Sequence, residues 1–375
     1  MKTRLDQWVV TVAFCGFLGI MAVLFFLLPK EEYSQLEKKV LAQFPEISAQ
    51  SITSGTLDDQ IELYMAEHLP GRAFFVGVDA YFRQLTLRQA AGDIYPAAGD
   101  RLVEEPVSEQ KGNLPGKLSA IRGFAAAAGK PVELMLIPSA GWAAGETIRG
   151  ITPSYRDEEI IQGIYAMAGP EVSPVDVTQL YKNRPSLYYR TDHHWTSEGA
   201  YLAGQAYCRQ KGIPFPEADT FTVEKIPGFY GSTYSRSALW LTAPDTLELW
   251  HGAAELTVTL RKPGTEALTE YDSVFFRDRL QEMDMYTAFL DGNNALVRIR
   301  NAAGSGKLLI IRDSYSNCLA PFLAQTFEEV VLVDLRYWSV MTPVSQLLEQ
   351  EEFDHILVCY SLYNFVTDAN IPLLR

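Results

Sequence analysis

The chain has 375 residues, 47% hydrophobic and 21% charged, an ordinary globular composition that excludes a disordered, collagen-like or coiled-coil protein. Its formal net charge is −14, and an excess of acid repels phosphate backbones, so nucleic acid is not an expected partner. Four cysteines without a C-x-x-C spacing are too few for a disulfide scaffold and support neither a zinc ribbon nor a thioredoxin-like site.

A run of 21 uncharged residues, Trp8–Leu28, predicts a membrane anchor. As a helix rising about 1.5 Å per residue, the run spans roughly 30 Å, the thickness of the hydrocarbon core of a bilayer. It is longer than a signal-peptide core, and no small-x-small cleavage site follows it. A buried core helix is the other interpretation, but a helix that is apolar on every side at an extreme terminus makes a poor core element.

The charges that flank this run predict its orientation. Because Lys2 and Arg4 precede it, the positive-inside rule leaves residues 1–7 in the cytoplasm and places the C-terminal part outside. We therefore expect a single-pass protein of the cell membrane with an extracytoplasmic domain. An odd number of cysteines in that domain leaves at least one free thiol, and any pairing among them stays open. These cysteines are Cys208, Cys318 and Cys359.

Residues 29–110 are predicted to form a stalk and a helical N-terminal region. Residues 31–44 are charged and helical in pattern, which suggests a short stalk. Residues 58–87 carry apolar side chains at helical spacing, interrupted by Pro70-Gly71, and this pattern predicts two helices around a turn.

Residues 111–375 alternate between helical and strand patterns, which predicts an α/β domain with a mainly parallel sheet covered on both faces. Residues 215–300 or thereabouts break the rhythm with short alternating runs and are predicted to be a β-rich insertion. The expected helices are 118–128, 157–167, 197–212, 317–325 and 342–351, and the expected strands are 131–138, 307–311, 330–335 and 355–360.

The first candidate for chemistry is the segment Tyr189–Gly199, which contains two adjacent histidines. In an extended segment, residues two apart point the same way, so Asp192 and His194 would share a face and His193 would point elsewhere. A carboxylate beside an imidazole fixes its tautomer and stabilises the imidazolium. The alternatives are a helix cap with surface histidines, and a metal site of these three residues, on which consecutive side chains do not easily converge.

The second candidate is Ser314, at the point where the strand 307–311 gives way to a helix. A serine there lies at the carboxyl end of a parallel strand, where open α/β sheets place their ligands, and near a helix N-terminus that can receive an oxyanion. The alternative is that Asp313, Ser314 or Ser316 only caps the helix. Together with Asp192 and His194, however, Ser314 completes the three parts of a nucleophilic triad.

Here the sequence resembles a family. The run Thr191–Trp195 looks like the signature of the DHHW proteins of Gram-positive bacteria. Further blocks extend the resemblance over most of the chain after about residue 55, and the leading anchor is also shared. These blocks are Tyr230-Gly231-Ser232, Tyr286–Asn294, Arg312–Tyr315 and Val333–Tyr337.

The family is similar in turn to the alginate O-acetylation proteins, so the resemblance implies an SGNH-hydrolase-like three-layer fold. It implies Ser314 as nucleophile, His194 as general base and Asp192 as the carboxylate that orients it. It also implies a membrane-bound O-acyltransferase as the partner that supplies acyl groups. The sequence departs from the Gly-Asp-Ser motif of those proteins, because Arg312 stands at the glycine position.

Four weaker candidates could bind substrate or stabilise an oxyanion: Arg336, Tyr286, Asn294 and Asn364, with Asn293 beside the third. We expect an acyl-ester enzyme, an O-acetyltransferase or acetylesterase, that acts on a cell-envelope polysaccharide without a cofactor. The alternative is a non-catalytic glycan-binding or assembly module on the same fold, which the departure at Arg312 favours.

Overall fold

The structure is a computed structural model, and its elements fall into two compact units. The first unit is Met1–Ala91 with Ala238–Trp240, and the second is Gly92–Ser237 with Leu241–Arg375. The domain boundary expected from the sequence stays a prediction. The described residues are 2–86, 93–109, 112–145, 154–338 and 343–374.

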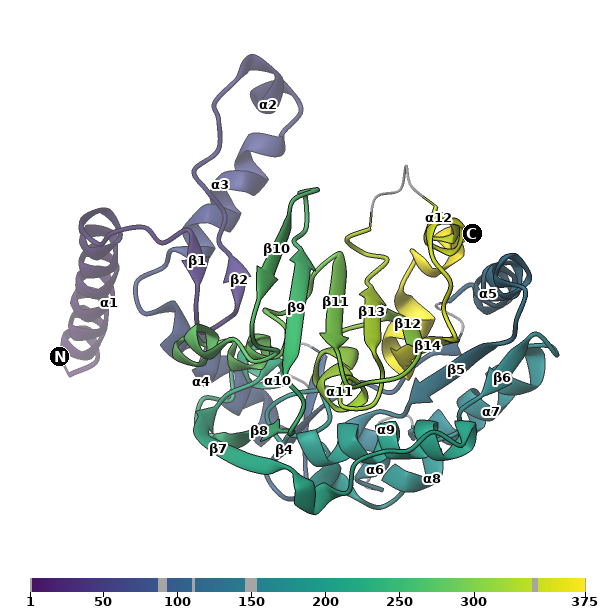
Figure 1. Cartoon of the computed structure of the whole chain (residues 1–375). Coiled ribbons are helices and arrows are strands. Elements are labelled where there is room, and N and C mark those ends of the chain that lie inside the picture. The colour runs from purple at the N-terminus through teal and green to yellow at the C-terminus, as the bar shows by residue number, and fades with distance from the viewer. Residues whose placement is uncertain (1, 87–92, 110–111, 146–153, 339–342, 375) are drawn as a thin grey trace. The chain divides into compact units, whose positions relative to one another are not determined.

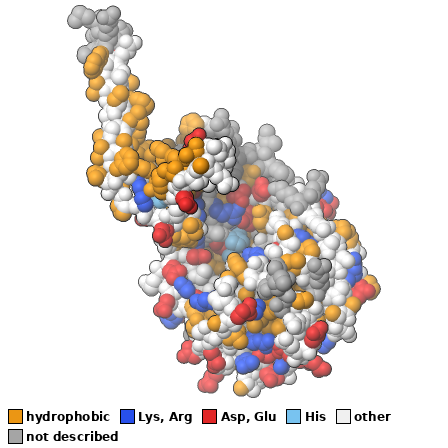
Figure 2. All heavy atoms as spheres, turned by 90° about the horizontal axis from the view of Figure 1, so that it is seen from above, with side chains coloured by type: hydrophobic (Ala, Val, Ile, Leu, Met, Phe, Trp, Pro, Cys, Tyr) orange, Lys and Arg blue, Asp and Glu red, His pale blue; other side chains and the backbone are white. Residues whose placement is uncertain are grey.

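The first unit begins with the long helix α1, Lys2–Leu27. Its segment Asp6–Leu27 has a mean hydropathy of 2.6 with none of it buried, so it is long and apolar enough to cross a membrane. Hydrophobic side chains lie along the visible face of this helix (Figure 2). The membrane itself and the orientation of the chain remain predictions.

The rest of the first unit corrects one prediction and confirms another. The segment 31–44 is not a helix, because β1 (Tyr33–Ser34) pairs with β2 (Lys39–Val40) in a short hairpin. This hairpin forms long-range ion pairs that a local pattern does not reveal, such as Lys39 with Glu67. The two expected helices around Pro70-Gly71 are present. They are α3, Thr56–Glu67, and α4, Arg72–Leu85, preceded by the short helix α2, Ala49–Thr53.

The second unit contains an eight-stranded mixed sheet in the order β10-β9-β11-β13-β12-β14-β5-β6. The strands from β13 to β6 run parallel, and β11, β9 and β10 extend the sheet with antiparallel pairs. In sheet order the strands are Leu268–Tyr271, Leu256–Arg261, Leu296–Asn301, Glu329–Val333, Lys307–Arg312, His355–Ser361, Val132–Ile137 and Val172–Pro174. Each strand expected from the sequence is present in the parallel part.

Helices cover both faces of this sheet (Figure 1). On β12, Leu308 and Ile310 face the core formed with α9 and α11, whereas Leu309 and Ile311 face the core formed with α5, α7, α12 and α13. The period-2 alternation of a strand therefore divides one apolar run between two cores. The helices are α5 Leu114–Ala128, α6 Ala140–Ala143, α7 Asp157–Met167, α8 Thr178–Tyr181, α9 Ser197–Lys211, α10 Ser232–Ser237, α11 Ser316–Leu323, α12 Ser345–Gln350 and α13 Leu362–Thr367. Residue 342, where the last long helix was expected to start, lies outside the described residues.

The segment 215–300 is β-rich, as predicted, but only part of it stands apart from the main sheet. Strands β7 (Thr222–Phe229) and β8 (Asp245–His251) pair with each other, whereas β9, β10 and β11 join the central sheet. A further hairpin, β3 (Ile94–Ala97) with β4 (Arg101–Glu104), also belongs to the second unit. The result is a three-layer α/β fold with a mixed, mainly parallel sheet (Figure 1), as the sequence pattern predicts.

Candidate active site

Ser314 lies at the carboxyl end of the sheet, between β12 and α11. Its Oγ is 2.8 Å from Nε2 of His194, although the two residues are 120 positions apart. Ser314 is 8% exposed and His194 is 5% exposed, so this contact is largely shielded from water. A serine hydroxyl within hydrogen-bond distance of an imidazole is the geometry that allows the imidazole to take its proton.

His194 is held on its other side by Asp192. Nδ1 of His194 lies 2.5 Å from Oδ1 of Asp192, and the backbone N–H of His194 donates to the same oxygen at 2.9 Å. The second carboxylate oxygen accepts a hydrogen bond from the backbone N–H of Ser232 at 2.6 Å. The carboxylate therefore orients the ring so that Nε2 is directed at Ser314. The segment ends where Thr196 caps α9.

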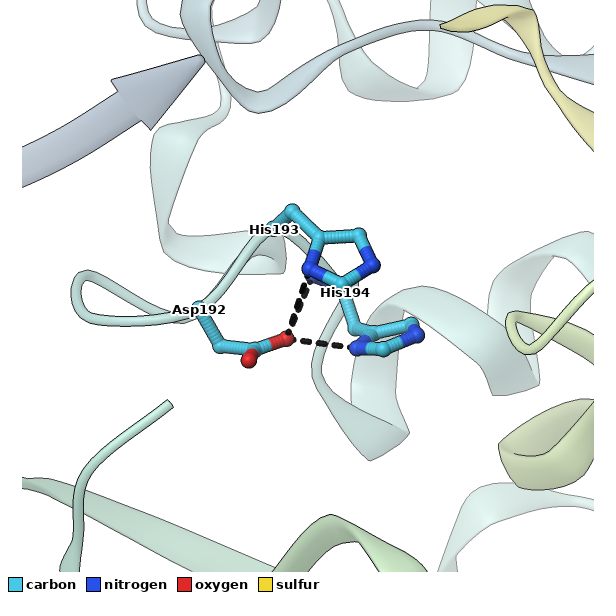
Figure 3. A group of neighbouring side chains, drawn as sticks. All are labelled: Asp192, His193 and His194. Atoms are coloured by element: carbon cyan, nitrogen blue, oxygen red, sulfur yellow. Dashed lines mark hydrogen bonds and ion pairs between the residues drawn. The ribbon is translucent and has the colours of Figure 1, made fainter. Parts of the chain in front are cut away.

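His193 does not point elsewhere, and that part of the prediction is wrong. Its ring lies over that of His194, with centroids 3.8 Å apart, and its Nδ1 is 3.5 Å from Oδ1 of Asp192 (Figure 3). The reason is that residues 190–194 form a bend instead of an extended segment, so the alternation of a strand does not apply.

The position of the Asp192 side chain depends on Gly231. In the sequence, Gly231 stands out only as part of the block Tyr230-Gly231-Ser232 that resembles the family. A Cβ at Gly231 would lie 2.1 Å from Cβ of Asp192 and 2.4 Å from its Oδ2, closer than real atoms approach. The absence of a side chain at this position therefore lets the carboxylate reach its place.

If Asp192, His194 and Ser314 act together on an ester, we expect Gly231→Ala to displace Asp192 and to lower the rate of ester cleavage by about 10²–10⁴-fold, the range lost when an acid–base group is misplaced. The measurement is kcat/KM with p-nitrophenyl acetate. Gly123→Ala is the matched control, because a Cβ there meets nothing within 4 Å. Equal activity in both variants would show that the position of Asp192 is not needed.

Tyr286 covers the remaining face of His194. The two rings are stacked with centroids 3.8 Å apart and an interplanar angle of 10°. Burial raises the pKa of the Tyr286 phenol well above its ordinary value, so the phenol stays protonated and an uncharged ring packs against His194. Tyr315 contacts His194 on another side, at 4.9 Å between centroids.

Asp313 anchors the turn that carries Ser314. It is fully buried and accepts hydrogen bonds from the backbone N–H of Tyr315, from the backbone and hydroxyl of Ser361, and from the amide of Asn364. Asn364, one of the weaker sequence candidates, thus contacts the site through Asp313. These bonds connect the end of β12 to the end of β14.

Arg312 is fully buried, and its side chain contacts the loop that precedes β11. Its guanidinium donates to Oδ1 of Asn293 and to the backbone oxygen of Asn294, both at 3.2 Å, and lies 3.6 Å from Asp334. Burial lowers its pKa, and Asp334 acts against that shift. Because Arg312 belongs to strand β12 and has no positive φ, its backbone does not require the glycine of the related motif.

Asn293 and Asn294, in the loop that precedes β11, differ in their roles. The amide of Asn294 donates to the backbone oxygens of Leu290 and Gly292, so it stabilises the loop. Asn293 lines the cavity, and its Oδ1 accepts from both Arg312 and Asn317. Its NH₂ group is therefore the part that remains for a ligand.

A cavity of about 320 Å³ opens in front of Ser314 and His194. Of the four weaker candidates, Arg336, Tyr286 and Asn364 line it, and Asn294 does not. Arg336 is held by Asp334, with its Nη2 at 2.7 Å from Oδ2. Charged and hydroxyl groups also line the cavity, which suits a polar ligand. They are Glu104, Ser139, Ser232, Arg236, Asp284, Thr287 and Tyr363.

The alternative interpretation is a metal site formed by Asp192, His193 and His194, although three consecutive side chains do not easily converge on one ion. Their potential ligand atoms do lie within 4.8 Å of one another. Nδ1 of His194 and Nδ1 of His193 are, however, already engaged by Asp192 and by the hydroxyl of Ser232 respectively. A cation would have to displace these contacts, so the donor set fits an orienting network better than a metal centre.

The cysteines do not take part in this site. Cys208, Cys318 and Cys359 are buried free thiols. Burial raises the pKa of Cys208 and of Cys318 to about 12, which keeps both thiols protonated and unreactive near neutral pH.

The surroundings of His193 change the pKa of its imidazole. Burial first, and the neighbouring His194 second, lower its pKa below the ordinary value of 6.5. Asp192, Glu104 and Asp313 act in the opposite direction without reversing the shift. His193 is therefore neutral in the folded chain at a pH where it is already protonated in the unfolded chain.

This difference predicts a pH dependence of stability. Above pH 6.5 the contribution of His193 is fully present; as the pH falls from 6.5 through the lower folded pKa, the unfolded state binds the extra proton and stability is lost. We expect His193→Gln to flatten this acid limb in thermal unfolding curves recorded between about pH 5 and pH 8. Parallel curves for the two proteins would contradict the assignment.

Residues 130–333 match the DHHW protein family, and because this segment is more than half of the chain, the chain belongs to the DHHW family. A DHHW family protein from Eubacterium siraeum is 25% identical, with a TM-score of 0.64 over 76% of this chain and 95% of its own. No curated protein sequence matches.

Two further solved structures are similar. Bacillus cereus PatB1 with a sulfonyl adduct is 18% identical, with a TM-score of 0.61 over 73% of this chain and 96% of its own. The O-acetyltransferase domain of Pseudomonas putida AlgJ is 15% identical, with a TM-score of 0.45 over 74% of this chain and 94% of its own. The likeness to PatB1 shows a shared fold.

Proposed function

We propose that the chain is a membrane-anchored, extracytoplasmic acyl-ester enzyme. It transfers acyl groups, in particular acetyl groups, to hydroxyls of a cell-envelope polysaccharide. The observation that carries this proposal is the chain of contacts from Asp192 through His194 to Ser314, at 2.5 and 2.8 Å, at the mouth of a cavity. These are the three groups that nucleophilic acyl transfer needs, in the order in which it needs them.

The first half of the reaction acylates the serine. Ser314 Oγ attacks the acyl carbonyl carbon while Nε2 of His194 takes the hydroxyl proton, and Asp192 stabilises the imidazolium that forms. The carbon–oxygen bond to the leaving group then breaks, and the leaving group receives the proton from His194. In the second half a sugar hydroxyl attacks acyl-Ser314, with His194 again as base; attack by water instead gives an esterase.

The oxyanion of the tetrahedral intermediate is stabilised by hydrogen-bond donors. The NH₂ group of Asn293 and the backbone N–H of Ser314 are the groups that would meet it, since Asn293 is oriented by its bonds to Arg312 and Asn317. Preorganised donors of this kind contribute about 10²–10³-fold to turnover each. In this account Arg312 acts through Asn293, as a positioning residue.

The location proposed for the enzyme defines its partners. An extracytoplasmic domain has no direct supply of cytoplasmic acyl donors, so a membrane-bound O-acyltransferase would pass acyl groups across the membrane to Ser314. The anchor α1 would keep the domain beside that partner. The acceptor would be a cell-envelope glycan, for which the polar lining of the cavity is suited.

The test is intact mass spectrometry of the full chain in detergent after a short exposure to p-nitrophenyl acetate. We expect one acetyl group, located by peptide mapping at Ser314, that leaves when a soluble chito-oligosaccharide is added. A folded chain that gains no acetyl group would favour the non-catalytic glycan-binding module. A metal-dependent hydrolase would instead lose its esterase activity with a chelator and form no adduct.

A further inference from the structure

We infer that the acceptor is a vicinal diol, and that Nε2 of His193 hydrogen-bonds one of its hydroxyls while His194 takes the proton of the other. This inference rests on the proposed function, because it concerns the second half of the same reaction. It assigns to the first histidine of the Asp-His-His-Trp run, His193, a specificity role that the triad does not give it.

The two imidazoles direct their nitrogens the same way, although the ring planes are tilted by 37° (Figure 3). Figure 3 shows the rings one above the other, with Nδ1 of each ring on the side of Asp192 and Nε2 of each ring directed away from it. Nε2 of His194 is the atom that meets Ser314 Oγ. Nε2 of His193 is therefore directed to the same side (Figure 3), and His193, His194 and Ser314 line the same cavity.

The His193 ring is held in place and open to ligand at one nitrogen. Its Nδ1 lies 2.6 Å from the hydroxyl of Ser232, and the phenol of Tyr315 donates to its backbone oxygen. The side chain is 22% exposed against 7% for His194, and it lines the cavity. Because Nδ1 is engaged, Nε2 is the nitrogen that a ligand can reach.

The chemistry of a diol fits this pair. Adjacent hydroxyls on a sugar ring present two polar oxygens side by side, and two imidazoles with centroids 3.8 Å apart present two nitrogens on the same side (Figure 3). The oxygen facing His194 forms the new bond to the acyl carbon, its proton goes to Nε2 of His194, and the bond from that carbon to Ser314 Oγ breaks. Ser314 Oγ then recovers the proton from His194. His193 holds the neighbouring hydroxyl and exchanges no proton.

The test separates acylation from transfer. Acetyl-Ser314 is formed in the full chain with p-nitrophenyl acetate and then partitioned between propane-1,2-diol and propan-1-ol at equal concentration. We expect the wild type to prefer the diol by about tenfold, the contribution of one additional hydrogen bond, and His193→Phe to abolish the preference. The preference is a ratio of two products formed from chains that are already acetylated, so it does not depend on the rate of acylation. Ser232→Ala, which frees Nδ1 but keeps the backbone bond to Asp192, should reduce the preference in part.

Each outcome decides between the two proposals. A wild type that acylates but shows no diol preference overturns this inference and leaves the proposed function intact, and so does a His193→Phe chain that keeps the preference. If His193→Phe loses acylation and transfer together while unfolding normally, His193 only positions His194, and the inference is again wrong. A wild type that never acylates overturns both.

Discussion

Ser314→Ala should lower the turnover of p-nitrophenyl acetate by at least about 10³-fold, because removing the nucleophile of a triad leaves only the contribution of binding and of the oxyanion donors. The substitution removes a single oxygen from a residue that is 8% exposed and lies at a cavity, so the free energy of unfolding should change by less than about 1 kcal/mol. The two measurements are steady-state kinetics and urea unfolding of the full chain in detergent.

The matched control is Ser316→Ala, the same change two positions further along the chain. Ser316 is fully buried in the first turn of α11 and does not line the cavity. We expect this variant to keep its turnover within a few-fold of the wild type. If both serine variants were equally inactive, the loss would reflect damage to the turn, and the role of Ser314 as nucleophile would not stand.

Asp313→Asn should produce the largest loss of stability, about 3 kcal/mol in the free energy of unfolding. The buried carboxylate accepts four hydrogen bonds, and an amide in its place would direct N–H groups at N–H and O–H donors. Activity should fall as well, because the turn that carries Ser314 would lose its connection to Ser361. Urea unfolding followed by tryptophan fluorescence measures the effect.

Asn364→Ala tests the same hydrogen-bond network with a smaller change than Asp313→Asn. It removes one of the four donors to Asp313 and leaves the carboxylate in place, so we expect a loss of about 1 kcal/mol. A loss as large as that of Asp313→Asn would mean that the network does not depend on the carboxylate. A negligible loss in both variants would contradict the anchoring role of Asp313.

The parallel part of the fold could be predicted from the sequence because its signals are local. Apolar runs such as Lys307–Arg312 alternate with helices that carry their own caps, as at Thr196 and Asn113. The hairpin at Tyr33–Val40 could not, because its strands are only two residues long and its ion pairs reach distant residues, as Lys39 reaches Glu67. The entry of β9 and β11 into the central sheet could not either, because β11 pairs with strands that are distant in the sequence, β9 and β13.

The candidate site shows the same division. Asp192, His194 and Ser314 could be proposed from residue types at element ends, and the structure brings them together. The position of His193 required the bend of its segment, and no local pattern distinguished the cavity-lining Asn293 from Asn294 beside it.

Gly231 and Arg312 act only through long-range contacts, with Asp192 and with Asn293 respectively. Read as part of a motif, Arg312 favoured a non-catalytic protein. Its buried side chain and ordinary strand backbone show why an arginine fits beside this turn.

The most direct test of the account is labelling of the full chain with a fluorophosphonate, and with a sulfonyl fluoride in parallel, followed by peptide mapping. Such reagents react with serines that a neighbouring base has activated. We predict one adduct, on Ser314, that His194→Ala and Asp192→Ala slow and Ser314→Ala abolishes. A folded wild-type chain that remains unlabelled, or that is labelled equally without His194, would contradict the assignment of Ser314 as an activated nucleophile.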